Sequence, residues 1–177
     1  KLMLPLYAND FLFTSINTSH GLSDNQIRYI LQLPDGRMVF TTNGNINLYD
    51  GIHFSYLHRT DKNVYPLKQY DGFYRIYQSG DSLLWVKDYH KLMGINLYKE
   101  EYIRDLESYF QNKNIPEPIE NLFADCAGHI WILTDHKLQE LQTGIHITLS
   151  PNDTRQLQDL NTENDSLYLF YNTGEAV

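Results

Sequence analysis

Residues 36–49 read GRMVFTTNGNINLY, and this pattern of two short apolar runs around a turn occurs twice more along the chain. The second copy is SLLWVKDYHKLMGINLY at 82–98, and the third is GHIWILTDHKLQEL at 128–141. The tetrapeptide INLY itself occurs at 46–49 and at 95–98. Self-similarity at a fixed interval is the signature of a repeat protein, so the fold is predicted here from the repeating unit.

A single apolar or aromatic anchor residue marks each copy. The anchors lie 46, 46 and 37 residues apart, and they are Val39, Trp85, Trp131 and, in a fourth copy at 165–177, Tyr168. Because they recur at one position of the unit, we expect them to pack between neighbouring units rather than to bind a ligand. Aligning the anchors leaves three extra residues before the second INLY, which predicts an insertion that makes Tyr89 and His90 protrude.

Each unit is predicted to contain four short strands. Turn signals such as Asp35-Gly36 and Ala127-Gly128 separate the apolar runs,. In the first unit we expect strands at about 26–31, 37–42, 45–49 and 53–57. Four short strands in roughly 40–50 residues are typical of a β-propeller blade. The predicted fold is therefore all-β, a β-propeller fragment of about three and a half to four blades in an incomplete ring.

The predicted organisation is a single domain, residues 1–177. It has blades at approximately 22–60, 74–105, 120–149 and 155–177 and a lead-in strand at 8–17. A β-sandwich also has regularly spaced short strands, but it does not predict anchors at a near-constant interval. The segment YKEEYIRDLESYF at 98–110 can be read as an amphipathic helix. The repeat register favours an outer strand at Glu101–Arg104 with a helical turn after it.

The composition excludes several classes of protein. The chain has 177 residues, is 42% hydrophobic and carries a net charge of −8. That charge argues against a nucleic-acid partner and against docking on an anionic membrane surface. Cys126 is the only cysteine, so no internal disulfide and no cysteine-built metal site is expected,. No segment approaches the roughly 20 apolar residues of a membrane span. The opening KLMLPLYA fits either the tail of a signal peptide or an ordinary first strand.

The first unit resembles the opening repeat of the two-component regulator propeller family. In that pattern a GLS-x-N motif precedes a strand, a D-G-x-[ML]-W-[FI]-x-T strand follows, and an L-x-x-Y-D-G-x-x-F strand pair ends the unit. Here the matching stretches are Gly21–Asn25, Asp35–Thr42 and Ile46–Phe54. Val39 stands where the family usually has Trp, and the second copy lacks the glycine before its Trp. The match covers about 45 residues and is looser in the later copies.

This resemblance implies a sensory function. Propellers of this family are found in the periplasmic sensor region of hybrid two-component receptors of glycan-degrading bacteria. It therefore implies an extracytoplasmic, non-enzymatic sensor of oligosaccharides that signals to a histidine kinase outside this chain. It also implies that the chain is an N-terminal part of a larger receptor. Self-association, or contact with the rest of the receptor, is expected at the open edges of the part-ring.

Binding is expected where the repeats differ, on the face at which the loops between the second and third strands and the loops between blades gather. The candidate ligand-binding residues are Tyr89, His90, Tyr74, Arg75, His136 and Asp135. The same loops also contribute Asn43, Tyr70, Asp71, Glu120 and Arg155. Aromatic rings stack on the C–H faces of sugars, and Arg, Asp and His hydrogen-bond to hydroxyl groups.

Neither a catalytic motif nor a cofactor site is evident. The chain has no HExxH, no Walker loop and no GxSxG,. His129 and His136 belong to one predicted hairpin without an obvious third metal ligand, so no metal and no cofactor is expected. Two alternatives stay open beside the sensor: a protein-interaction or dimerisation scaffold of the receptor, and a polysaccharide-degrading propeller enzyme, which needs two suitably spaced carboxylates.

Overall fold

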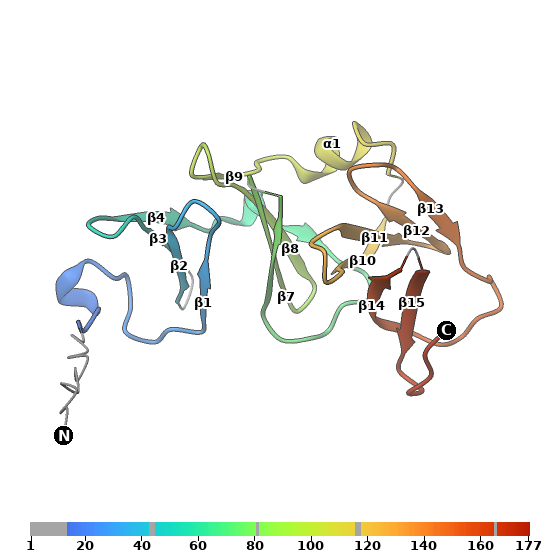
Figure 1. The fold of residues 1–177 in the computed structure, drawn as a ribbon. Coiled ribbons are helices and arrows are strands. Elements are labelled where there is room, and N and C mark those ends of the chain that lie inside the picture. Colours follow the sequence, from blue (N-terminus) through green and yellow to red (C-terminus); the bar gives the residue numbers. More distant parts are fainter. Residues whose placement is uncertain (1–13, 43–44, 81, 116–117, 165) are drawn as a thin grey trace, which may run out of the picture.

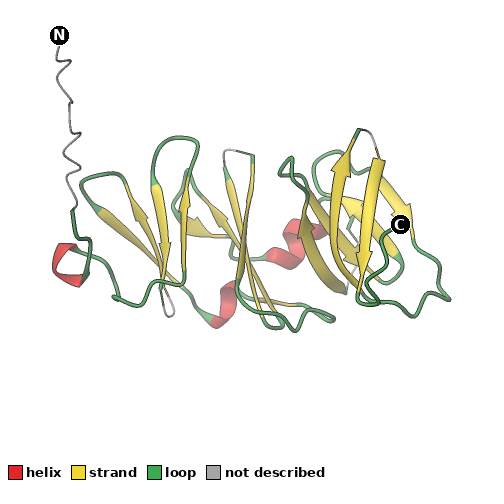
Figure 2. Cartoon of the chain, turned by 60° about the horizontal axis from the view of Figure 1, so that its bottom comes forward, coloured by secondary structure: helices red, strands yellow, loops and turns green. Residues whose placement is uncertain are grey.

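A computed structural model of the chain describes residues 14–42, 45–80, 82–115, 118–164 and 166–177. The described part consists of four antiparallel sheets that follow one another in a row (Figure 1), and the two ends of the row lie far apart (Figure 2). The prediction of an all-β propeller fragment with an incomplete ring is confirmed. The predicted lead-in strand at 8–17 lies outside the described residues up to residue 13, and residues 14–17 are in no strand.

The sheets are built from short consecutive strands. The first sheet contains β1 (Tyr29–Gln32), β2 (Met38–Thr41), β3 (Asn45–Tyr49) and β4 (Phe54–His58). The second contains β6 (Arg75–Ser79), β7 (Leu83–Asp88) and β8 (Lys91–Asn96). The third contains β10 (Ile119–Ala124), β11 (Ile130–Thr134), β12 (Lys137–Glu140) and β13 (His146–Thr148), and the fourth pairs β14 (Leu157–Glu163) with β15 (Ser166–Tyr171). The four strands predicted for the first unit agree with β1–β4 to within a few residues.

The outer edge of the second sheet is made of two short strands rather than one. β9 (Glu101–Tyr102) pairs with one end of β8, and β5 (Tyr65–Pro66), which precedes the sheet, pairs with the other end. The favoured reading of 98–110 is confirmed, because β9 is followed by the helix α1 (Leu106–Gln111). Asp105 caps that helix, since its carboxylate accepts from the Ser108 amide at 2.9 Å,. Two short 3₁₀ helices complete the described elements, η1 (Thr18–His20) and η2 (Asp61–Asn63).

Each sheet buries one face against the next sheet. Val39 packs in a cluster shared by the first and second sheets, Trp85 in one shared by the second and third, and Trp131 in one shared by the third and fourth. These three anchors are at most 6% exposed. Tyr168 is 41% exposed, because no further sheet among the described residues covers its face. The prediction that anchors pack between blades is thus confirmed at three positions and wrong at Tyr168.

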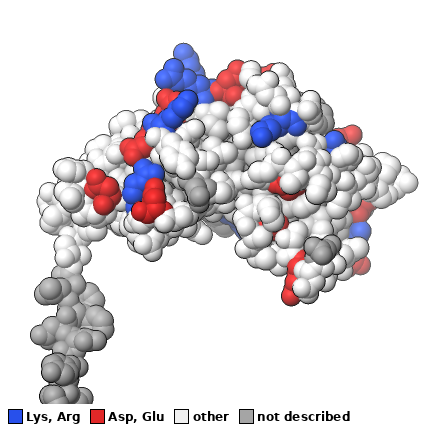
Figure 3. All heavy atoms as spheres, turned by 45° about the horizontal axis from the view of Figure 1, so that its top comes forward, with Lys and Arg blue, Asp and Glu red and all other residues white. Residues whose placement is uncertain are grey.

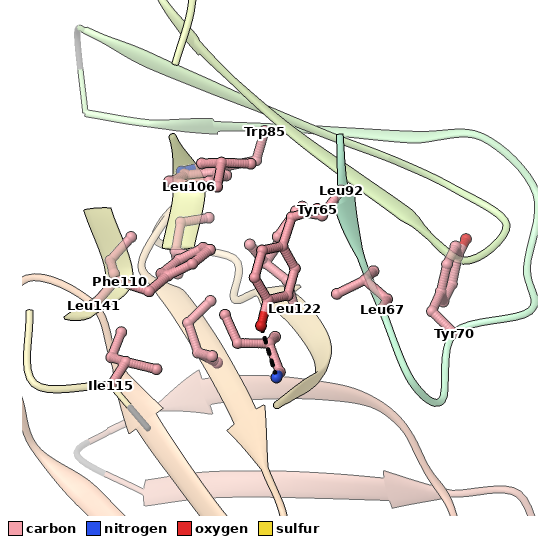
Figure 4. Close-up of a cluster of buried hydrophobic side chains, with 13 residues drawn as sticks. Tyr65, Leu67, Tyr70, Trp85, Leu92, Leu106, Phe110, Ile115, Leu122 and Leu141 are labelled. Atoms are coloured by element: carbon pink, nitrogen blue, oxygen red, sulfur yellow. Dashed lines mark hydrogen bonds between the residues drawn. The ribbon is translucent and has the colours of Figure 1, made fainter. Parts of the chain in front are cut away.

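The helix α1 packs against the interface between the second and third sheets (Figure 4). Phe110 is fully buried and stacks on Trp85, with 5.7 Å between the ring centroids. Tyr65 meets the edge of Phe110, and its hydroxyl accepts a hydrogen bond from the Ile119 amide at 3.3 Å. Gly94 leaves room for this arrangement, because a Cβ there would lie 3.0 Å from the Trp85 ring. Trp85 is therefore enclosed between its own blade, the helix α1 and the blade that follows.

A buried carboxylate joins the third and fourth sheets at the β10–β11 turn. The side chain of Asp125 has no exposed surface and accepts hydrogen bonds from the Thr162 hydroxyl at 2.7 Å and from the Trp131 indole at 3.3 Å. Burial alone would raise the pKa of Asp125, but the hydrogen bonds from Thr162 and His129 outweigh it and hold the pKa below its usual value,. The ionised carboxylate of Asp125 thus connects the β10–β11 turn of the third blade to Thr162 of the fourth blade.

The strand register shows that the two INLY copies are not equivalent. Val39 pairs with Leu48, whereas Trp85 pairs with Gly94, so the second INLY lies three residues further along its blade. Asp88 pairs with Lys91, which leaves a two-residue turn at Tyr89-His90. In the first blade, too, only two residues separate Thr42 from Asn45, and the Thr42 amide donates to the Asn45 carbonyl. The predicted insertion at Tyr89-His90 is therefore wrong.

The anchors differ in what their removal should cost. We expect Trp85→Ala to lower the free energy of unfolding by about 3–5 kcal/mol, because it empties a fully enclosed site. The matched substitution at the same position of the repeat, Tyr168→Ala, should cost less than about 1 kcal/mol because that ring is already in contact with solvent. Urea unfolding of both variants measures the difference. Equal losses would contradict the packing described here.

Candidate functional site

The first strands of the second, third and fourth blades carry polar residues at the same end of each strand, along one edge of the row. Arg75, Asn121 and Asp159 occupy equivalent positions, because each pairs with the residue two places after an anchor. The ladder shifts by one residue just before Asn121 and just before Asp159. Such β-bulges redirect side chains and often lie beside binding sites. The extra residues, Glu120 and Gln158, therefore add side chains to this end of the blades.

A hollow of about 370 Å³ lies at this end, and we call it the central hollow. It is lined by the segment 69–75, by Asn121 from the third blade, and by Gln156 and Gln158 from the fourth. The segment that leads into β6 and the β7–β8 turn lie together at the lower edge of Figure 1. The hollow thus combines three blades, four side-chain amides and an aromatic ring, Phe73, which is 83% exposed.

Side chains link the second and fourth blades across this hollow. The Arg75 guanidinium lies 3.7 Å from the Asp159 carboxylate, and both groups are about half exposed. The side-chain amide of Gln156 donates to the Gln69 carbonyl at 3.0 Å. The exposed ion pair contributes little to stability. The pair nevertheless shows that a side chain of the second blade and one of the fourth lie next to each other at the hollow.

The loop that forms one wall is held by backbone hydrogen bonds to the neighbouring turn. The Tyr89 amide donates to the Gly72 carbonyl at 3.0 Å, and the Leu67 amide donates to the His90 carbonyl at 2.7 Å. The Tyr70 hydroxyl donates to the Phe73 carbonyl. A Cβ at Gly72 would come within 2.6 Å of the Tyr70 ring, so only glycine fits this close approach,. The exposed Phe73 therefore projects from a well-supported loop.

A buried lysine lies beneath the central hollow. Lys87 is 1% exposed, and its ammonium donates to the Asn121 side chain at 2.9 Å and to the Leu122 carbonyl at 2.6 Å. The same ammonium lies over the Tyr70 ring, 4.1 Å from its centroid,. Burial, together with the positive charge of Arg75, lowers the pKa of Lys87 to about 7,. Since Asn121 and Tyr70 also line the hollow, Lys87 positions two of its walls.

The structure brings four of the six predicted site residues together. Tyr74 and Arg75 line the central hollow. Tyr89 lines an adjoining hollow between the first two blades, to which Tyr74 also contributes. His90 lies 3.8 Å from Asp71, which belongs to the central wall.

The other two predicted residues lie elsewhere on the same edge. Asp135 and His136 line a smaller hollow of about 100 Å³ between the third and fourth blades, together with Glu120 and Arg155. This hollow shares only Gln69 with the central one among the described lining residues. The two turns are nevertheless alike, because Tyr89 (φ 52°) and Asp135 (φ 38°) both adopt the left-handed conformation and each precedes a histidine.

Sequence reasoning did not identify Phe73 or the four amides, Gln69, Asn121, Gln156 and Gln158. The amides belong to no motif, and their convergence depends on the bulges and on the curvature of the row. Phe73 had a detectable signal, because it follows Gly72 in a predicted inter-blade loop beside Tyr70, Asp71 and Tyr74. An aromatic residue in such a loop has no partner in the repeat to bury it.

The described residues contain no group of side chains suited to hold a metal ion. Within the described part, no three His, Cys, Asp or Glu side chains are grouped so that they could hold a metal ion. No helix of the described chain has the length and apolar character needed to cross a membrane. On the face shown in Figure 3, acidic and basic side chains alternate instead of forming a patch of one sign.

These observations define a class: the chain is an open segment of a β-propeller, with polar hollows along one edge. No protein-family model matches the chain, and no curated protein sequence matches it. The extracellular domain of a putative hybrid two-component system from B. thetaiotaomicron is similar in structure, with a TM-score of 0.53 and 16% identity. The similarity covers 92% of this chain and 24% of that one. At this identity the likeness shows the fold.

Two other solved structures are similar with lower scores. The extracellular domain of a putative one-component system from B. thetaiotaomicron has a TM-score of 0.41 and 15% identity over 88% of this chain and 30% of that one. A catalytically inactive virginiamycin B lyase from Staphylococcus aureus, with quinupristin, has a TM-score of 0.48 and 13% identity over 85% of this chain and 50% of that one. The present chain therefore spans half or less of the length of these three neighbours.

Lys87 should give the protein a characteristic alkaline stability profile. Its pKa falls from 10.5 in the unfolded chain to about 7 in the folded one, so between these values the unfolded chain binds more protons. The free energy of unfolding then rises with pH in this window, by at most about 1.4 kcal/mol per pH unit for one proton. Lys87→Met should remove this rise, which urea unfolding between pH 7 and 9.5 measures.

The matched control is Lys91→Met, three residues beyond the β7 end, where the lysine is exposed. This variant should keep the pH dependence of the unmodified chain. A Lys87→Met variant whose stability still rises between pH 7 and 9.5 as in the unmodified chain would show that Lys87 does not titrate there.

Proposed function

We propose that this chain is part of an extracytoplasmic, oligosaccharide-sensing propeller of a hybrid two-component receptor, and that it signals to a histidine kinase outside the chain. The central hollow carries the proposal, because loops of three blades place an exposed aromatic ring among several side-chain amides. Sugars are bound in proteins by this combination, in which a ring covers a C–H face and planar amides hydrogen-bond to hydroxyl groups.

The candidate residues divide between the hollow and its rims. Tyr74 and Arg75 act in the central hollow, with Phe73 as the stacking platform. Tyr89 and His90 extend the surface towards the first blade, and Asp135 and His136 extend it towards the fourth. A chain of several sugar units along this edge would contact more than one blade.

The comparison with solved structures supports the sensor class. The neighbour with the TM-score of 0.53 is an extracellular domain of a putative hybrid two-component system, and it includes nearly all of this chain's fold. The periplasmic location belongs to the same proposal, as does the absence of enzymatic activity. The described lining of the central hollow contains one carboxylate, that of Asp71, whereas glycoside hydrolysis normally requires two,.

Signalling requires that the ligand favour one arrangement of the receptor over another. A ligand can shift such an equilibrium only by its differential affinity for the two states. In the central hollow the ligand lies beside Arg75, whose ion pair with Asp159 joins the second and fourth blades. Binding that competes for either group would change how these blades are held. The movement would then be passed to the remainder of the receptor.

A scaffold role is the second candidate, and the exposed face of the fourth blade favours it. Tyr168 is 41% exposed and Phe170 is 40% exposed on the face that in the other three blades packs on the next sheet. Exposed aromatic residues on such a face are typical of interaction surfaces. The occupant in this proposal is another copy of the chain or the remainder of the receptor.

Calorimetry against a panel of oligosaccharides tests the sensor proposal. We expect Phe73→Ala to weaken binding at least tenfold, because it removes the stacking platform, and joint substitution of Arg75, Tyr89 and His90 to abolish it. The matched control is Tyr98→Ala, which removes a ring that is 75% exposed on the β8–β9 turn and should leave affinity unchanged. Unchanged affinity in Phe73→Ala and in the joint variant would refute the site.

A further inference from the structure

The side-chain amide of Asn121, which lines the central hollow, has only one possible orientation. Its oxygen accepts from the Lys87 ammonium at 2.9 Å and from the Leu122 backbone amide at 2.8 Å. An ammonium group and a backbone N–H can only donate, so the atom that meets them must be the oxygen of Asn121 and not its nitrogen. The Leu122 amide donates at any pH, so this orientation does not depend on the protonation of Lys87.

The side-chain nitrogen of Asn121 is therefore left as a donor at the central hollow. Within the described part of the chain it donates to no protein group. The nitrogen is not sealed off from solvent, since the enclosed side-chain atoms without a partner are those of Thr41 and Trp85. Asn121 as a whole is only 5% exposed, and a buried donor without an acceptor costs free energy,. The third blade thus offers a ligand a recessed donor.

Two glutamines supply acceptors on the other walls of the hollow. The side-chain nitrogen of Gln156 donates to the Gln69 backbone carbonyl at 3.0 Å, and that of Gln69 donates to the Glu120 carboxylate at 2.7 Å. Carbonyl and carboxylate oxygens only accept, so the amide nitrogens must face them. Among the described residues, neither side-chain oxygen receives a hydrogen bond. The hollow therefore combines a donor from the third blade with acceptors from Gln69 and Gln156.

This pattern is complementary to a secondary amide, whose carbonyl accepts and whose N–H donates. In a sugar, the acetamido group is such an amide. Its carbonyl oxygen lies further from the ring than a hydroxyl oxygen does, so it can reach a recessed donor while the ring stays at the mouth of the hollow. The rings of Tyr70, Phe73 and Tyr74 also line the hollow and provide an apolar surface for the acetyl methyl group,.

We infer that the central hollow binds an N-acetylated amino sugar, with the Asn121 side chain donating to the acetamido carbonyl and the Gln156 side chain accepting from the acetamido N–H. This inference rests on the proposed oligosaccharide-sensing function and specifies its ligand class. A peptide also contains secondary amides, but the 83% exposed ring of Phe73 at the same hollow favours a sugar, whose C–H face covers an aromatic platform,.

The test compares sugars that differ only in the substituent at one ring carbon. Calorimetry of the purified chain uses three tetrasaccharides of the same linkage: chitotetraose with acetamido groups, cellotetraose with hydroxyl groups, and the chitosan tetramer with amino groups. A second pair, N-acetylgalactosamine and galactose, tests the other ring configuration. We expect the acetylated member to bind at least tenfold more tightly than its hydroxyl counterpart in at least one pair, because the counterpart leaves the Asn121 donor without an acceptor.

The outcomes separate this inference from the sensor proposal. Equal or weaker affinity for the acetylated member in both pairs overturns the inference and leaves the sensor proposal standing. If neither these sugars nor the panel of other oligosaccharides bind, both fail. Binding of acetylated dipeptides with the same affinity as the acetylated sugars would likewise overturn the assignment to an amino sugar.

A substitution of one atom assigns the preference to Asn121. Asn121→Asp keeps an oxygen for Lys87 and Leu122 but replaces the donating nitrogen by a second oxygen. It should abolish the preference for acetylated members. It should also tighten binding of the chitosan tetramer several-fold, because an ammonium group can pair with the new carboxylate, and misfolding cannot produce such a gain.

The matched control is Asn161→Asp on the first strand of the fourth blade. The Asn161 side-chain oxygen accepts from the Cys126 amide at 3.0 Å, a bond that Asp can also accept, and Asn161 does not belong to the lining of the central hollow. This variant should bind every sugar as the unmodified chain does. A preference for acetylated members that persists in Asn121→Asp contradicts the site.

Discussion

The packing of each sheet on the next is the constraint on which the rest of the structure depends. Successive residues of a strand point to opposite faces, so Trp85 faces the third blade while its neighbours Leu84 and Val86 face the first,. A sheet of three or four short strands is marginal alone, and each blade becomes stable by burying both faces. The inner blades achieve this, and the outer faces of the row stay uncovered within the described chain.

Much of this arrangement could be predicted from the sequence, because core packing repeats. Trp85 and Trp131 lie 46 residues apart because the same interface is filled twice, and the turn residues between them follow from hairpin geometry,. The helical turn after β9 was also predictable, since Leu106 and Phe110 lie on one face of a helix. These features follow from the spacing of apolar residues and from turn residues, and both can be read from a single sequence.

The prediction of the strand register was wrong where the same short sequence occupies different positions in two blades. Ile46 and Leu48 face the second blade, while Ile95 and Leu97 face the first, so the two INLY copies meet in one cluster from opposite sides. Two identical tetrapeptides have the same pattern of apolar residues, but they can pair differently with the neighbouring strand. The strand register therefore depends on the pairing and not on the tetrapeptide. The bulges before Asn121 and Asp159 also could not be predicted from the sequence. The amides of the central hollow were therefore not predicted either. Tyr74, Tyr89 and Asp135 were all predicted for one binding face. Tyr74 and Tyr89 line one hollow, whereas Asp135 lines a separate one.

The β7–β8 and β11–β12 turns have the same length, and this uniformity has a consequence for how such a protein can change. Tyr89-His90 and Asp135-His136 each close their hairpin with two residues, and the first residue of each pair has a positive φ. A new side chain at the second position alters the edge of the propeller without shifting the ladder behind it. The chemical character of this edge can therefore diverge by point substitution at these two turns while the packing of the sheets is unchanged.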